Sequence, residues 1–268
     1  MTHGSDPGIS LPDAVIDCLS KNLPSPAARG KPMSDLLSSV LAAHGGLERW
    51  QKLKTGAAMV HSSGKLLDMK AQGGIPLRFT VSLHEQAVSI APIGADWRSS
   101  FTPNRVVIEK TTGEVIAERT NPRESFRDHD LNTKWDPLDR TYFGAYATWN
   151  YLNAPFMFMI PGVQTEEISR LEQNGESWRG LQVTLPDGLA SHSRVQKFYF
   201  GEDFLLRRLD YTLDIAGRPN IAHYVYDHAR FDGLVVPTKR RAYLCDDRYR
   251  VLYDQLLIAL DLSEIEYR

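Results

Sequence analysis

The segment HSRVQKFYFGEDFLLRRLDYTL, residues 192–213, indicates the fold class. It contains two runs in which side chains of different polarity alternate, and Gly201, Glu202 and Asp203 separate the two runs. A period of two is typical of a β-strand, and a short break that contains glycine is typical of a hairpin turn. The segment therefore predicts two neighbouring antiparallel strands.

Similar short runs, each bounded by Gly, Pro, Asn or Asp, extend on both sides of this hairpin. Before the hairpin they cover residues 56–61, 65–71, 77–84, 87–90, 106–109, 115–119 and 180–185. After it they cover residues 221–230, 235–243 and 251–261. Strands joined by short turns form antiparallel meanders. We expect a sheet of about eleven antiparallel strands.

A helical period appears at the start of this region. Apolar residues recur at helical spacing between Ser34 and Lys54, and Gly45 and Gly46 interrupt the pattern; the apolar residues are Leu37, Val40, Leu41, Leu47, Trp50 and Leu53. The spacing predicts a broken helix with one apolar face.

An apolar insert lies between the two groups of strands. Residues 135–158 carry eight aromatic side chains: Trp135, Tyr142, Phe143, Tyr146, Trp149, Tyr151, Phe156 and Phe158. A sheet with one apolar face needs a cover. We expect this insert to be helical and to cover the concave side of a curled sheet.

Composition excludes several classes of protein. The 268 residues are 42% hydrophobic and 24% charged, which is average for a globular domain. With 31 Lys and Arg against 33 Asp and Glu, the formal charge of −2 does not favour a nucleic acid partner. No apolar run is long enough to span a membrane.

The first 33 residues differ from the remainder of the chain. They are rich in Gly, Pro and Ser and show no signal-peptide pattern, and we interpret them as a flexible extension before a single domain over residues 34–268. Two distant cysteines, Cys18 and Cys245, match no metal or redox spacing. We therefore expect a cytoplasmic protein with reduced thiols. The oligomeric state is left open.

Two motifs resemble a known superfamily. AAHGGLERWQKLKT, residues 42–55, and FDGLVVPTKRRAY, residues 231–243, are similar to the opening and closing signatures of the lipoprotein-carrier-like superfamily, the LolA and LolB type. WNYLNAPFMFMIPGV, residues 149–163, and HSRVQKFYF, residues 192–200, resemble a cytoplasmic bacterial branch of it. The resemblance implies an unclosed β-barrel with a hydrophobic cavity between sheet and helices. In periplasmic members that cavity holds acyl chains, and another member is a cytoplasmic enzyme without a cofactor.

The expected architecture is mainly β, of the α+β class. It is a single unclosed antiparallel β-barrel of about eleven strands, with an N-terminal broken helix and a central helical insert that cover the concave side. This fold implies a place for a ligand but names no reaction.

Polar side chains gather on the second group of strands. If neighbouring faces align across the meander, six of them reach one wall: His192, Gln196, Arg208, Asp210, His223 and Arg240. The alternative is that this polar face points to solvent while the leucine face forms the core. Alternation alone leaves both orientations open.

Each of these residue types has a possible role. His192 or His223 could act as an acid or base, with Asp210 as the orienting carboxylate. Arg208 or Arg240 could anchor a ligand anion, and Gln196 could contact the ligand. The aromatic residues Trp149, Tyr151 and Phe156 could either cover the core or contact a ligand.

We expect neither a cofactor nor a metal. The known phosphate, dinucleotide, hydrolase and zinc motifs are absent, and His223 and His228 are five residues apart in a strand, which directs them to opposite faces. The favoured function is a cofactor-independent acid/base enzyme, of isomerase, cyclase or lyase type, for a hydrophobic or aromatic small molecule. The alternative is a non-catalytic carrier of a lipid-like molecule.

Overall fold

The computed structural model describes residues 34–70 and 75–268. The predicted extension over residues 1–33 lies outside the described residues. The strands are β1 (Thr55–Ser63), β2 (Leu77–Ser82), β3 (Val88–Pro92), β4 (Trp97–Thr102), β5 (Arg105–Lys110), β6 (Val115–Thr120), β7 (Gln164–Gln173), β8 (Glu176–Thr184), β9 (Val195–Phe200), β10 (Leu206–Thr212), β11 (Asn220–Phe231), β12 (Leu234–Cys245) and β13 (Val251–Tyr267).

The helices are α2 (Asp35–Ala43), α3 (Leu47–Lys52), α4 (Lys65–Met69) and α5 (Pro137–Asn153), with 3₁₀ turns η1 (Pro122–Phe126), η2 (Phe156–Met159) and η3 (Asp214–Ala216). None of the helices in the described part of the chain has the length and apolar character that crossing a bilayer requires.

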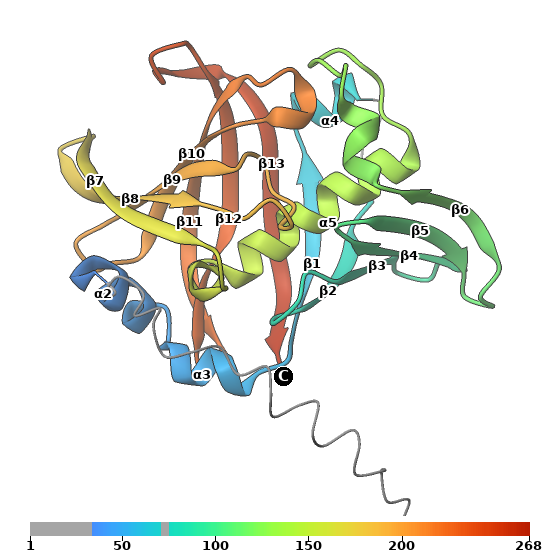
Figure 1. The fold of residues 1–268 in the computed structure, drawn as a ribbon, viewed down its shortest axis with the longest axis horizontal. Helices are drawn as coiled ribbons and strands as arrows, with labels where there is room; N and C mark the ends of the chain where they lie inside the picture. The colour runs from blue at the N-terminus through green and yellow to red at the C-terminus, as the bar shows by residue number, and fades with distance from the viewer. Residues whose placement is uncertain (1–33, 71–74) are drawn as a thin grey trace, which may run out of the picture. The chain divides into compact units, whose positions relative to one another are not determined.

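The described strands form one antiparallel sheet that does not close. Its order is β6-β5-β4-β3-β2-β1-β13-β12-β11-β10-β9-β8-β7, so β1 pairs with the last strand and the two ends, β6 and β7, do not pair with each other. Figure 1 shows the sheet curling around α5, which crosses its concave side. The predicted class, an unclosed mainly β fold with helical cover, is confirmed.

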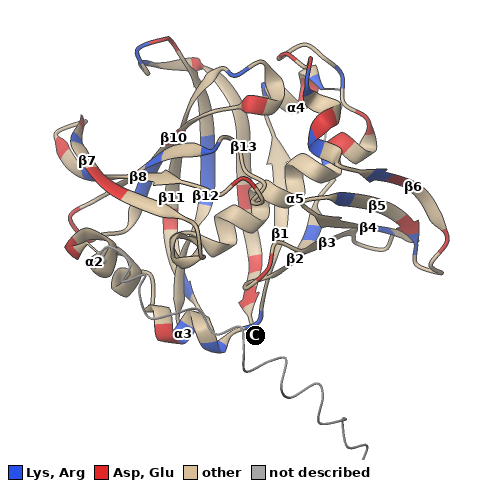
Figure 2. Ribbon diagram, in the orientation of Figure 1, with Lys and Arg blue, Asp and Glu red and all other residues tan. Residues whose placement is uncertain are grey.

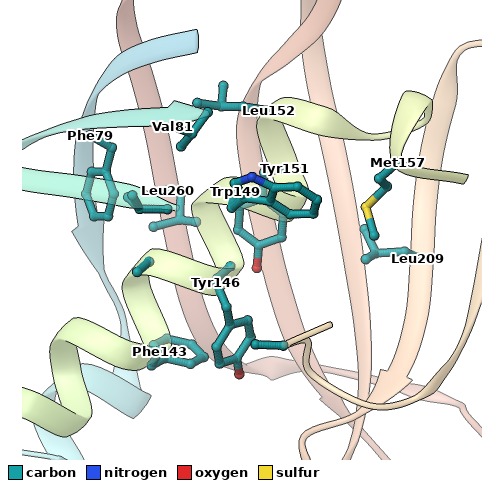
Figure 3. Packing of buried hydrophobic residues seen from close by; sticks show 14 of the residues in the cluster. Phe79, Val81, Phe143, Tyr146, Trp149, Tyr151, Leu152, Met157, Leu209 and Leu260 are labelled. Atoms are coloured by element: carbon teal, nitrogen blue, oxygen red, sulfur yellow. The ribbon is translucent and has the colours of Figure 1, made fainter. Parts of the chain in front are cut away.

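Helix α5 is buried along almost its whole length. Asp136 caps its N-terminus by accepting a 2.8 Å hydrogen bond from the backbone N–H of Asp139, and Pro137 occupies the first turn. Its aromatic side chains fill the space between the two halves of the sheet (Figure 3). The predicted helical insert therefore forms the centre of the core.

The predicted broken helix is also confirmed, as α2 and α3 with Gly45 and Gly46 between them. Gly45 has a φ of +115°, and a Cβ there would lie 2.3 Å from the carbonyl oxygen of Gly233, in the turn between β11 and β12. The backbone N–H of Val235 donates a 2.9 Å bond to His44 O beside this contact. The two motifs that carry the family resemblance thus pack against each other.

Three details of the sequence prediction were wrong. Residues 65–71 were predicted as a strand, but Lys65–Met69 is helix α4, because Leu66 and Leu67 are both buried and a strand would point one of them outward. Strands β4 and β7 were missed, since β7 is an edge strand with an exposed polar sequence and the alternation of β4 includes the buried Ser99.

Candidate ligand-binding site

A buried polar cluster lies between α5 and strands β9 to β12. His192, in the segment before β9, sits between two tyrosines of the helix: Tyr146 Oη is 3.2 Å from Nδ1 and Tyr151 Oη is 2.8 Å from Nε2. Its ring stacks on Tyr211 of β10, with centroids 4.2 Å apart and an interplanar angle of 10°. Both ring nitrogens are therefore engaged by tyrosine hydroxyls.

Tyr151 also joins His223 and Arg240 to this cluster. The His223 ring lies 5.1 Å from the Tyr151 ring, and its Nδ1 is 3.4 Å from Tyr211 Oη. The Arg240 guanidinium lies 4.2 Å above the Tyr151 ring and donates from Nη2 to Tyr151 O at 3.2 Å. Among the described residues, no acidic side chain hydrogen-bonds to His192, His223 or Arg240.

Burial determines the charge states in this cluster. His192, His223 and Arg240 are each at most 1% exposed. Burial, with a contribution from Arg123 and Arg240, lowers the pKa of His192 to about 3, and burial also lowers the pKa of His223 well below its usual value. Both imidazoles are neutral at pH 7. Because their pKa values are low, both are weak bases. A general base works best with a pKa near the working pH, so neither is well suited to that role.

Arg208 and Asp210 lie on the opposite face of the sheet from this cluster. Arg208 is paired with Tyr224 and Asp210 with Ala222, while the intervening Leu209 is paired with His223. Cross-strand partners share a face, so Leu209 and His223 face α5 and the arginine and aspartate face the convex side. The predicted common wall is wrong for this pair, and Asp210 cannot orient either histidine.

The convex pair is buried by its own small cluster. Arg208 Nε donates to Asp210 Oδ1 at 2.6 Å and Nη2 donates to Oδ2 at 3.0 Å, while Nη1 donates to Tyr224 Oη at 3.0 Å. The surrounding apolar cluster consists of Trp178, Tyr199, Ala222, Tyr224 and Cys245. These contacts satisfy the pair within the fold.

The other predicted contact residues have structural partners. Gln196 donates to Ser193 O at 3.0 Å, and Trp149 Nε1 donates to the carbonyls of Ser82 and Glu85 at 2.7 and 2.9 Å. Phe156 stacks on Trp50 with centroids 5.8 Å apart. Trp149 and Phe156 therefore pack as core cover, which is one of the two predicted alternatives.

The polar cluster encloses almost no free space. The void beside it has a volume of about 10 Å³, and its lining includes the polar side chains of His192, Gln196 and Arg240, with Asn150, Tyr151 and apolar neighbours. That is room for about one water molecule. The described residues contain no group of three or more His, Cys, Asp or Glu that could hold a metal ion.

A larger, apolar crevice opens between the start of α5 and strands β2 to β5. It has a volume of about 260 Å³, and its walls include Leu77, Phe79, Ile90, Trp97 and Ile108 from the sheet. Figure 2 shows that most of α5 carries no charge, its charged residues being confined to the first turn.

The crevice adjoins the packed core. A second cavity of about 20 Å³ shares Phe79 and Arg140 with it and reaches Tyr151 and Leu260. Phe79 and Leu260 both line the small cavity, and Figure 3 shows their side chains beside α5. The crevice and the small cavity therefore form one apolar region along the helix.

The sequence prediction did not identify this region. Trp97 and Ser99 belong to β4, which was not predicted as a strand, and Arg140 was treated only as part of the helical insert. The aromatic insert and the predicted concave cover were the only signals that pointed toward it.

Comparisons with known proteins give distant likenesses. No family model and no curated protein matches the chain. Among solved structures, a DUF1329 family protein from Desulfovibrio piger is similar with a TM-score of 0.44 and 10% identity over 87% of this chain and 94% of the other. A LolA superfamily protein from Nitrosomonas europaea is similar with a TM-score of 0.48 and 9% identity over 86% and 92%. These likenesses are too distant to indicate a ligand.

Proposed function

We propose that this protein binds a hydrophobic, lipid-like molecule without transforming it, in the crevice between α5 and strands β2 to β5. The observation that supports this is the apolar wall of an open crevice on the concave side of the sheet. Ligand sites are usually concave, mostly apolar and about 300–1,000 Å³ in volume. At about 260 Å³, this crevice suits one alkyl chain or one small apolar molecule.

The residues that form the walls of the crevice favour burial of a hydrocarbon. Phe79, Ile90 and Ile108 are buried and belong to the same core as α5, so the sheet side of the wall is part of the packed core. Trp97 is partly buried and packs against that core. Each methylene moved from water onto such a surface contributes about 0.8 kcal/mol to binding.

The acid/base enzyme favoured by the sequence has less support from the geometry. His192 and His223 are neutral and enclosed, Asp210 is on the other face, and the void beside the histidines admits about one water. The catalytic roles of these three residues stay a prediction. The non-catalytic alternative agrees better with an open apolar crevice and a closed polar cluster.

A neutral fluorescent probe tests this function. N-phenyl-1-naphthylamine should bind the purified protein with a rise in fluorescence, and 1-dodecanol should displace it. Trp97→Gln should weaken probe binding about fivefold, because it removes a partly buried aromatic wall. Ile116→Gln, at an exposed position on the neighbouring β6, is the matched control and should leave binding unchanged.

Two results would overturn the proposal. One is the absence of saturable probe binding to a folded wild-type protein. The other is equal binding by wild type and Trp97→Gln, which would place the probe elsewhere.

A further inference from the structure

Arg140 is the charged side chain of the apolar region. It lies in the first turn and a half of α5 and lines both the crevice and the adjoining small cavity. No other Asp, Glu, Lys or Arg among the described residues lines either space. A ligand in the crevice would therefore meet one positive charge within apolar walls.

The described residues supply little to balance the charge of Arg140. The hydrogen bond that the described residues form with the Arg140 guanidinium runs from Nη2 to Ser62 Oγ on β1, at 3.0 Å. Burial lowers the pKa of Arg140 to about 10, so it remains charged at pH 7. A cation that is partly withdrawn from water without an anion beside it costs the fold free energy.

The acids nearest in sequence are already committed to another arginine. Arg119 of β6 donates from Nη1 to Asp139 at 2.7 Å and also pairs with Asp136 at the N-terminus of α5. Arg208 likewise has Asp210. Arg140 differs from both, because its guanidinium faces the crevice and not a carboxylate.

Gly144 makes space for this guanidinium one turn further along the helix. A Cβ at Gly144 would lie 2.6 Å from Arg140 Nη1 and 3.6 Å from Phe79 Cζ. Glycine in the middle of a helix is less stable than alanine by about 1 kcal/mol. The helix thus carries a less favourable residue at the position that lets the charge lie beside the crevice.

Arg240 also has no acidic partner among residues 34–70 and 75–268, but its guanidinium is not accessible to a ligand. Its guanidinium is enclosed by Tyr151 and its neighbours, and the void beside it holds about one water. Arg140 is half-buried at an open crevice, so it can meet a ligand without rearrangement of the core.

We propose that the ligand of this crevice is a single-chain amphiphile with an anionic head group, and that Arg140 binds the head while Phe79, Ile90 and Trp97 contact the chain. This inference rests on the proposed function. Guanidinium groups bind carboxylate and phosphate oxygens through paired hydrogen bonds, which suits either acid. The acidic head would supply the anion that the described part of the chain does not place beside Arg140.

The test compares probes with the same chain and different heads. Binding of dodecanoate, dodecyl phosphate and 1-dodecanol is measured by displacement of N-phenyl-1-naphthylamine below the micelle concentration. Wild type should bind at least one of the two acids tenfold or more tightly than the alcohol. A tenfold difference in affinity corresponds to the free energy that a hydrogen bond to a charged group contributes. Whichever acid is preferred identifies the head group.

Variants connect that preference to the arginine. Arg140→Gln should lose the preference and retain the affinity for 1-dodecanol, while Arg140→Lys should keep part of it. Arg98→Gln is the matched control, since Arg98 is exposed, is paired with Glu109, and lies next to Trp97 in the chain but on the other face of β4.

The outcomes separate the two proposals. If the alcohol binds and the acids show no preference, or if Arg140→Gln keeps the preference, the head-group inference is wrong and the hydrophobic site stands. If none of the three amphiphiles binds, the proposed function itself fails.

Discussion

Asp210 and Arg208 form a two-point ion pair within one strand, on the face of the sheet opposite His223. The side chains are 5% and 3% exposed. Burial raises the pKa of Asp210, and the hydrogen bonds and positive charge of Arg208 oppose that rise. The pair is therefore a structural part of the cluster on the convex face.

Asp210→Asn should lower the free energy of unfolding by about 3 kcal/mol, because it leaves the Arg208 charge buried without an anion. Urea unfolding measures this loss. Asp227→Asn is the control, since Asp227 forms an exposed ion pair with Lys239 and should change stability by less than about 1 kcal/mol. Probe binding in the crevice should be the same in both variants. A small loss of stability with a loss of binding would restore a ligand-contacting role for Asp210.

Acid should destabilise the protein before its carboxylates titrate. Burial lowers the pKa of His44 to about 4 and of His192 to about 3, and it also lowers the pKa of His223 well below its usual value. The unfolded chain binds protons at these residues below pH ~6.5, whereas the folded chain does not. The contribution of these histidines to the free energy of unfolding is therefore fully present above that pH and is lost as the pH falls.

Each of these histidines should contribute a slope of about 1.4 kcal/mol per pH unit once the pH is well below 6.5. Urea unfolding between pH 7 and pH 5 measures the total slope. His223→Leu should reduce the slope by about 1.4 kcal/mol per pH unit, the share of one histidine. Among the described residues, its ring faces Tyr151, Tyr211 and Arg240 and no carboxylate. Equal slopes in wild type and variant would contradict the buried neutral state.

The fold could be predicted from local patterns because most strands have one face in the core. β2 illustrates this: Phe79 and Val81 are buried while Thr80 between them is exposed. The pattern fails where a strand has no buried face, as in β7, and where adjacent leucines are both buried, as in α4. In those segments long-range packing and not alternation determines the structure.

The site was harder to predict because it depends on which face of each strand points inward. A register shift lies between Leu206 and Arg208 in the pairing of β10 with β9. Leu206 lines the void beside α5, and after the shift Leu209 faces α5 and Arg208 faces outward. Sequence alternation cannot show such a shift. Arg140 and Ser62, 78 residues apart, are joined only by the fold.

Trp50→Ala should lower the free energy of unfolding by about 3–5 kcal/mol, the usual cost of truncating a buried large aromatic. Trp50 is 6% exposed, stacks on Phe156 and donates from Nε1 to Asn153 Oδ1 at 3.2 Å. It therefore attaches α3 to the end of α5. Gln51→Ala, at the exposed neighbouring position, should stay within about 0.5 kcal/mol. Thermal unfolding of Trp50→Ala at the wild-type temperature would show that α3 is not part of the core.

Gly144→Ala tests the space that the helix leaves for Arg140. The new methyl group would lie 2.6 Å from Arg140 Nη1, the end of a flexible side chain, and at an ordinary 3.6 Å from Phe79. The guanidinium should therefore move while the core stays in place. Alanine also favours the helix, so the free energy of unfolding should remain equal or rise by up to about 1 kcal/mol.

Ligand binding should respond in the opposite direction. With the guanidinium displaced from the crevice, the preference for an acid over 1-dodecanol should fall severalfold in Gly144→Ala, while the affinity for the alcohol changes little. Adding Arg140→Gln should then cause no further loss, because two changes that act through one group are not additive. Displacement titrations of the two single variants and the double variant measure this. An unchanged acid preference in a stable Gly144→Ala protein would show that the position of the Arg140 guanidinium does not determine head-group binding.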